Sequence, residues 1–152
     1  MKRNVARWVR KLLAGEQRNT SGRKIYPEYI SFDDGSRPGW WKDELADDQW
    51  GRIFGVHEYE PNNPINAFMV TEMGLAVFGE GGKVTWLPYT RVKGWEKLSK
   101  EPVSMSLRVQ VTSGGVVELF FPRPGGAFTF VQFLDRAIWE HVHRPGADQE
   151  RS

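Results

Sequence analysis

The three histidines, His57, His141 and His143, are the side chains best suited to acid–base or metal chemistry at neutral pH. His141 and His143 lie two residues apart near an expected helix end, and residues at i and i+2 do not share a helix face. A zinc site would need further ligands, and no His-Glu-x-x-His spacing occurs. We therefore predict no metal site. An enzyme that uses His57 with Glu58 or Glu60 is one open hypothesis.

Two pairs of adjacent carboxylates, Asp33 with Asp34 and Asp47 with Asp48, are the next candidates for chemistry. Neither pair has the alternating ligand spacing of a calcium loop, and Asp33 is expected to accept backbone N–H bonds in a turn. The glycine-rich residues 79–82 are not followed by the Lys-Ser/Thr that opens a phosphate-binding helix. No Gly-x-Ser-x-Gly elbow and no cysteine occur. The sequence thus predicts no catalytic residue and no cofactor.

A basic amphipathic helix at the N-terminus carries the most distinctive binding chemistry. Apolar residues recur at i, i+3, i+4, i+7 and i+8, the spacing of one helical face. These residues are Val5, Trp8, Val9, Leu12 and Leu13. Basic residues fill the rest of the turn: Lys2, Arg3, Arg7, Arg10 and Lys11. A helix this short persists in water only when it docks on something.

Two kinds of docking partner are open for this helix. The favoured one is the rest of its own domain, because most amphipathic helices turn their apolar face to their own core. The alternative is an acidic protein groove or an anionic membrane, to which each nearby Lys or Arg contributes roughly 1 kcal/mol. The residues predicted to make such a contact are Arg7, Trp8, Arg10, Lys11 and Leu12. Nucleic acid is disfavoured, because no aromatic–basic platform or reading helix accompanies the charge.

Tryptophan is unusually frequent, with seven residues in the chain. Packing in a core is the default for such rings, but tryptophan is also enriched at binding hot spots. Trp40 and Trp41 follow a Pro-Gly pair, and two adjacent residues cannot both point inward from a regular element. We therefore add Trp40 and Trp41 to the predicted contact residues. Further rings that could line a groove for a partner are Trp50, Trp86, Trp95 and Trp139.

The net charge of +2 conceals a segregation along the chain. Residues 1–24 hold eight basic residues and one acidic residue, whereas residues 25–64 hold three basic and nine acidic ones. The two segments could neutralise each other by folding together. Alternatively, the acidic residues between 33 and 48 could block a basic partner, as in a small regulatory or immunity-type protein. Such binding would be tight and sensitive to salt.

The secondary structure predicted to position these residues differs between the two halves of the chain. Residues 24–32 are strand-like, with Pro27 confining them to a sheet edge, and residues 40–54 are predicted to form a helix. From residue 67 onward the hydrophobic pattern has period two between Gly-rich turns. The predicted strands are residues 67–71, 75–78, 83–87, 92–98, 105–112 and 117–121, followed by a helix from about 128 to 142.

These elements predict an α+β fold that is mainly antiparallel β. The strands would form a bent sheet or small barrel closed by the C-terminal helix, because such a helix covers the open end or face of the sheet. The N-terminal helix would be an extension of this unit.

Four short strings in the second half of the chain carry a family resemblance. Residues 69–75 (MVTEMGL) are similar to an opening T-x-x-G-L hairpin, and residues 86–95 (WLPYTRVKGW) to an I-P-Y-x-x-I strand pair. The hairpin at residues 107–121 and the helix at 128–142 are similar to the final strands and helix of the same family. Over about residues 66–143 the chain thus resembles a bacterial pleckstrin-homology-like (PH-like, GRAM-like) domain.

The resemblance implies binding of an anionic lipid, a peptide or a protein, without catalysis. Members of the family that grip phosphoinositides use Lys and Arg between the first strands. Here the corresponding loop, residues 72–74, contains an acid and no base. Phosphoinositide recognition in that style is therefore disfavoured.

The sequence predicts four parts. Residues 1–24 form the basic amphipathic helix and a linker, and residues 25–64 an acidic, aromatic-rich extension packed on the domain. Residues 65–144 form the PH-like β domain with its C-terminal helix, and residues 145–152 a disordered tail. The longest apolar run is far too short to span a bilayer, and charges interrupt any signal-peptide core. We expect a cytoplasmic, non-catalytic binding module that contacts another protein or, as a peripheral protein, an anionic membrane surface.

Overall fold

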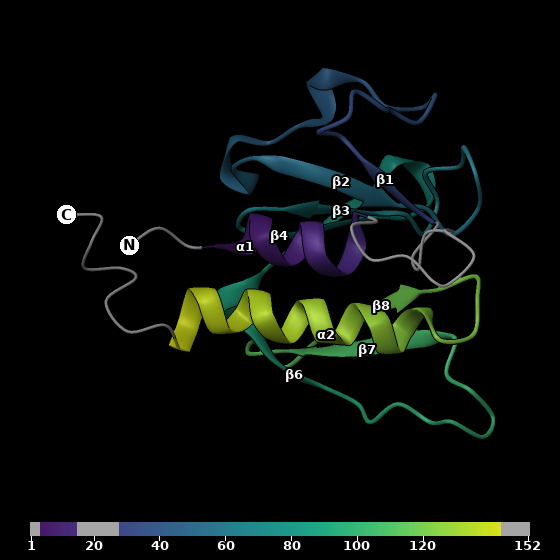
Figure 1. Ribbon diagram of the computed structural model, residues 1–152, viewed down its shortest axis with the longest axis vertical. Helices are drawn as coiled ribbons and strands as arrows, with labels where there is room; N and C mark the ends of the chain where they lie inside the picture. The colour runs from purple at the N-terminus through teal and green to yellow at the C-terminus, as the bar shows by residue number, and fades with distance from the viewer. Residues whose placement is uncertain (1–3, 15–27, 144–152) are drawn as a thin grey trace.

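The computed structural model describes residues 4–14 and 28–143, so the predicted tail of residues 145–152 lies outside the described residues. The described strands form two antiparallel sheets, with the orders β1-β2-β3-β4-β5 and β6-β7-β8 (Figure 1). The strands of the first sheet are β1 (Tyr29–Ser31), β2 (Ile53–His57), β3 (Phe68–Thr71), β4 (Gly74–Phe78) and β5 (Val84–Pro88). Those of the second sheet are β6 (Val92–Trp95), β7 (Ser106–Val111) and β8 (Val116–Phe120).

Two helices cover one side of these sheets. α1 (Val5–Trp8) continues as a π-helical stretch (Val9–Leu13), and α2 (Gly126–Ile138) continues in the same way (Trp139–His143). The predicted N-terminal and C-terminal helices are therefore confirmed. α1 (purple) and α2 (yellow-green) lie side by side in Figure 1 and contact each other. No helix of the described residues has both the length and the apolar character that crossing a membrane requires.

Period-two alternation of side chains accounts for the regular strands. In β7, Leu107 and Val109 are buried whereas Arg108 between them is exposed. Gly114, with a φ of 101°, supplies the positive backbone angle that the tight β7–β8 hairpin needs. Among the described strands, β1 pairs only with β2, as expected of an edge strand. The mainly antiparallel α+β fold is confirmed, but the sheets of the described chain do not close into a barrel.

The helix predicted for residues 40–54 is wrong. Two single 3-10 turns (Asp43–Leu45 and Asp48–Trp50) occupy this segment, and β2 begins at Ile53. Leu45 is 40% exposed, whereas Trp50 and Phe54 are buried in two different clusters, so the apolar residues of this segment do not share one helical face. β2 instead pairs with β1 on one side and β3 on the other. Hydrogen bonds to two neighbouring strands outweigh a helical pattern that would be marginal on its own.

Two layers of apolar side chains lie on opposite faces of the five-stranded sheet. The inner core lies between the sheets and the helices, and it joins Phe68 and Leu75 to Val5 of α1 and Phe130 of α2. The outer cluster lies on the other face. Its members are Phe32, Trp50, Val56, Ala67, Met69, Ala76 and Phe78, with Ile30, Trp40, Trp41, Ile53 and Trp86 packed against them. Neighbours such as Phe68 and Met69 belong to different layers, as the alternation of side chains along a strand requires.

Candidate functional site

The apolar face of the N-terminal helix docks on the protein's own core. Val5, Val9 and Leu13 have only 1%, 3% and 1% of their surface exposed, and all three belong to the inner core together with residues of α2. The favoured docking partner of the helix is thus confirmed. In this arrangement these three side chains are not available to a membrane or to a partner's groove.

Trp8 adds polar and cation–π contacts between the N-terminal helix and the C-terminal helix. Its Nε1 donates a hydrogen bond to Glu140 Oε1 at 3.3 Å, and Glu140 is itself buried. Three cations approach the half-buried Trp8 ring: Arg7 at 5.3 Å, Lys11 at 5.9 Å and Arg136 of α2 at 5.1 Å from its centroid. Each such cation–π contact is worth about 0.5–1 kcal/mol at an exposed site. Positive side chains from both helices therefore lie on one surface around Trp8.

The other predicted contact residues of this helix divide by exposure. Arg7, Arg10 and Lys11 are exposed, whereas Leu12 is half-buried and packs against the inner core. Leu12 therefore supports the docked helix, and the exposed basic residues are the part of the prediction that a partner could reach.

A groove of about 670 Å³ runs between β6 and α2, beside the Trp8 surface. We call it the β6–α2 groove and define it by Lys93, Gly94, Trp95, Arg136, Trp139 and Val142, which line it. Trp139 and Val142 are among the most exposed large apolar side chains of the described chain, at 42% and 50%. Arg136 both lines this groove and stacks on Trp8, so the groove and the basic surface of the helix are continuous.

The backbone and the charge of this groove favour a particular kind of occupant. β6 pairs with β7 on one side and with no other strand of the described residues, so its second edge can still form main-chain hydrogen bonds. Lys93 and Arg136 line the groove, with Asp135 as its one acidic lining residue. Arg7 and Lys11 add positive charge next to Arg136. The free strand edge and the positive charge are therefore complementary to an extended polypeptide segment that carries acidic side chains.

Trp40 and Trp41 lie in the outer cluster, on the opposite face of the sheet from the helices. Trp40 Nε1 donates to Glu58 Oε2 at 2.8 Å, and its ring lies 5.3 Å from that of Phe78. Trp41 Nε1 donates to Asp43 Oδ1 at 3.1 Å. Both rings can pack on the sheet because this segment is not a regular element. The structure does not bring these two residues together with the contact residues of the N-terminal helix.

His57 is fully buried in the inner core, stacked on Phe68 with 4.6 Å between ring centroids. Burial, with a smaller contribution from the cation Arg123, lowers the pKa of His57 to about 3. Glu58 accepts its hydrogen bond from Trp40, in the outer cluster, and Glu60 accepts one from Asn63 Nδ2 at 3.3 Å. The structure therefore does not assemble His57 with Glu58 or Glu60 as an acid–base pair.

The residues of the T-x-x-G-L and P-Y strings have structural roles. Thr71 Oγ1 donates to the Gly74 carbonyl at 2.7 Å, and Tyr89 Oη donates to the Thr71 carbonyl at 2.9 Å. A Cβ on Gly74 would lie 2.3 Å from the Leu87 carbonyl oxygen, so only glycine fits there. His141 Nε2 lies 2.8 Å from the Glu72 carbonyl oxygen and completes this buried network. These contacts join the β3–β4 turn to Tyr89 and to the C-terminal helix.

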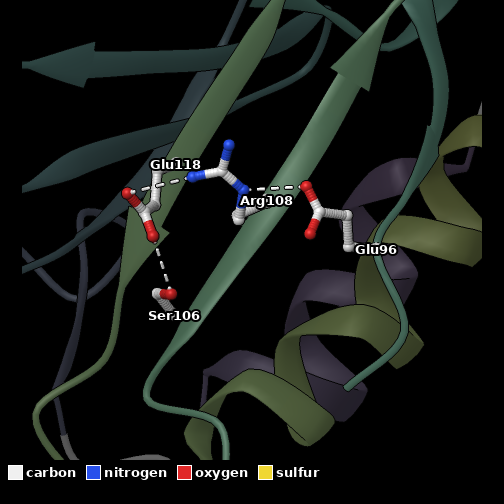
Figure 2. Close-up of polar contacts among 4 residues, drawn as sticks. All are labelled: Glu96, Ser106, Arg108 and Glu118. Carbon is white, nitrogen blue, oxygen red and sulfur yellow. Dashed lines mark hydrogen bonds and ion pairs between the residues drawn. The ribbon is translucent and has the colours of Figure 1, made fainter. Parts of the chain in front are cut away.

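Arg108 joins two carboxylates on the exposed face of the three-stranded sheet (Figure 2). Its Nε lies 2.8 Å from Glu96 Oε2, and its Nη1 lies 3.8 Å from Glu118 Oε1. Ser106 Oγ donates to Glu118 Oε2 at 2.9 Å. The hydrogen bond and charge of Glu96 raise the pKa of Arg108. Because Arg108 and Glu118 are direct cross-strand partners in β7 and β8, this network is explained by strand pairing.

The adjacent carboxylates also have local partners. Asp34 Oδ1, rather than Asp33, accepts a backbone hydrogen bond, from Ser36 N at 3.0 Å, while Asp33 pairs with Arg52 at 2.7 Å. Asp47 Oδ1 accepts from Gln49 N at 3.0 Å and caps the second 3-10 turn. Within residues 4–14 and 28–143, no three His, Asp or Glu side chains come together as a group that could hold a metal ion.

Sequence reasoning found part of the β6–α2 groove. Trp95 and Trp139 were among the rings predicted to line a groove, and the structure places both there. Trp50 and Trp86 instead stack on each other with 6.1 Å between ring centroids. Lys93, Arg136 and Val142 were not predicted. Trp139 and Val142 are three residues apart on the helix, but only the packing of α2 shows that this pair points away from the core.

Comparisons of the chain with protein-family models, with curated proteins and with solved structures find no match. The resemblance to PH-like domains therefore stays a prediction.

Proposed function

We propose that this protein is a non-catalytic, PH-like binding module of the cytoplasm that holds an extended, acidic segment of another protein in its β6–α2 groove. The order of short antiparallel strands followed by a C-terminal helix, on which the family resemblance rests, is present from β3 to α2. That order supports the PH-like part of the proposal.

The observation that carries the proposal is the meeting of a sheet edge with exposed apolar side chains in one groove. β6 has a free edge within the described chain, and Trp139 and Val142 are exposed beside it. An extended peptide that adds to a sheet edge gains affinity from main-chain hydrogen bonds and specificity from pockets for alternate side chains. Here the Trp139 and Val142 side chains would receive apolar residues of the peptide.

The charge around the groove favours an acidic segment. Lys93 and Arg136 line it, and Arg7 and Lys11 extend the positive surface across Trp8. Complementary charge raises the association rate and suppresses wrong partners more than it raises affinity. The acidic residues between 33 and 48, by contrast, have local roles at Asp33, Asp34, Asp43 and Asp47, so the groove is the better supported contact surface.

Selection from a displayed library of random peptides tests this function. The full-length protein should enrich peptides that combine acidic residues with alternate apolar ones. Val142→Ser should reduce their affinity at least about fivefold, because it removes an apolar contact from the groove. The matched control is Leu45→Ser, which changes a similarly exposed apolar residue outside the groove. The control should bind the selected peptides as the wild type does.

Three outcomes would contradict the proposal. The first is a selection without enrichment, and the second is a set of peptides that bind Val142→Ser and the wild type equally. The third is binding to phosphatidylserine vesicles, measured by co-sedimentation, without binding to any peptide. That last result would assign the basic surface to a membrane instead of a protein.

A further inference from the structure

A second hollow, of about 640 Å³, lies on the other side of the 3-10 turn Tyr89–Arg91 from the groove. It opens between two sheet edges, with β5 on one side and the β7–β8 hairpin on the other. We call it the β5–β8 hollow. Thr90 lines both this hollow and the β6–α2 groove, so the two are separated by a single turn of chain. Its volume is within the range of small-molecule sites.

The hollow has an apolar floor and a polar rim. Leu87, Val111 and Val117 line it and also belong to, or pack against, the inner core. Polar side chains surround them, among them Thr85 and Ser113. A small ligand with an apolar body could therefore reach the edge of the inner core without opening it.

The charge in this hollow has one sign. No Asp or Glu lines it, and Arg91 is its one charged lining residue. Arg91 is exposed, and it has no ion pair with any residue in the described part of the chain. A guanidinium without an internal carboxylate beside an apolar floor is complementary to a carboxylate that carries an apolar chain.

We propose that the β5–β8 hollow binds a small amphipathic carboxylate. Its apolar chain lies against Leu87, Val111 and Val117, and its carboxylate pairs with Arg91. This site is distinct from the peptide groove, because it shares only Thr90 with the groove's lining and takes a ligand of another class.

Titration of the full chain with decanoate, below its micelle concentration, tests the proposal. Binding is followed by the amide chemical shifts of residues 85–91 and 111–117. Wild-type protein should show saturable shifts confined to these residues. Arg91→Gln should weaken decanoate binding about tenfold, since a charge-assisted hydrogen bond is lost. Decanol should bind the wild type and Arg91→Gln equally, because it carries no charge.

Two further variants keep the test specific. Lys93→Gln removes a cation that lines only the β6–α2 groove, and it should leave decanoate binding unchanged. Thr85→Leu should fill part of the hollow and weaken decanoate and decanol together. Thermal melts show whether each variant is folded.

Three results would overturn the assignment of this site. They are a wild-type titration that does not saturate, equal weakening by Lys93→Gln and Arg91→Gln, and binding of decylammonium as tight as that of decanoate.

Discussion

The inner core and the outer cluster lie on opposite faces of one sheet and are both rich in aromatic rings, but they are held in different ways. In the inner core, Phe68, Phe121 and Phe130 are fully buried and contact one another, with ring centroids 4.9 to 6.0 Å apart. In the outer cluster, Trp40 and Trp41 are half-buried, and each donates its indole N–H to a carboxylate. Apolar packing holds both layers, but the outer cluster also has polar contacts along its edge.

The two layers also differ in what they position. The inner core joins both sheets and both helices, so it sets the geometry of the β6–α2 groove and of the β5–β8 hollow. The outer cluster fastens the irregular chain before β2 to the sheet. We therefore expect changes in the inner core to alter the whole fold, and changes in the outer cluster to have smaller, local effects.

Phe130→Ala should have the largest effect. Removing a fully buried ring that contacts Phe68, Phe121 and Phe133 should lower the free energy of unfolding by about 3–5 kcal/mol. Trp41→Ala, which changes a half-buried ring at the edge of the outer cluster, should cost clearly less. Urea unfolding of both variants measures the two values, and equal losses would remove the distinction between the layers.

Acid should weaken the inner core through His57. Because the pKa of His57 falls from 6.5 to about 3 on folding, the folded state binds fewer protons than the unfolded state between these pH values. The stability is fully present above about pH 6.5 and decreases as the pH falls toward 3. The loss should amount to a few kcal/mol.

His57→Phe isolates this contribution from that of the surface carboxylates. Its free energy of unfolding should depend less on pH between 6.5 and 3 than that of the wild type, as measured by urea unfolding at several pH values. Identical pH dependence in the two proteins would show that His57 does not carry the acid sensitivity.

Trp40→Phe should have an intermediate effect on the outer cluster. The substitution keeps a ring but removes the N–H that Glu58, only 7% exposed, accepts. Loss of a partner from a buried polar group costs about 1–3 kcal/mol. Trp41→Phe is the matched control, since its acceptor Asp43 is exposed to water, and it should lose less. Thermal melts of both variants test whether Trp40→Phe loses more stability than Trp41→Phe, as expected if the burial of Glu58 sets the cost.

Tyr29→Phe should have the smallest effect, and in the opposite direction. The Tyr29 hydroxyl is buried in the inner core without a hydrogen-bond partner among the residues that the structure describes. Replacing an unsatisfied hydroxyl should leave the stability unchanged or raise it by up to about 1 kcal/mol. Tyr89→Phe is the contrasting variant, because its hydroxyl donates to the Thr71 carbonyl, and it should be destabilised. A marked loss in Tyr29→Phe would contradict apolar packing as the main stabiliser of the inner core.

The periodic parts of the chain could be predicted, and the irregular part could not. The strands from β3 to β8 and both helices follow from apolar residues at period two or at helical spacing. The segment before β2 misled the prediction, because Trp41 and Leu45 are four residues apart, a helical spacing that arises here by coincidence. Its conformation depends instead on side-chain contacts with residues far along the chain, such as the 2.8 Å hydrogen bond from Gly39 N to Asn62 Oδ1.

The candidate site shows the same division. Sequence alone determined that a basic amphipathic helix stands at the N-terminus and that Trp95 and Trp139 could line a groove, because residue type and spacing contain that information. The tertiary structure decided that the apolar face of the helix is used internally, and that Arg136 connects Trp8 to the β6–α2 groove. Only the packing of one element against another selects which apolar and basic side chains are covered and which stay available to a partner.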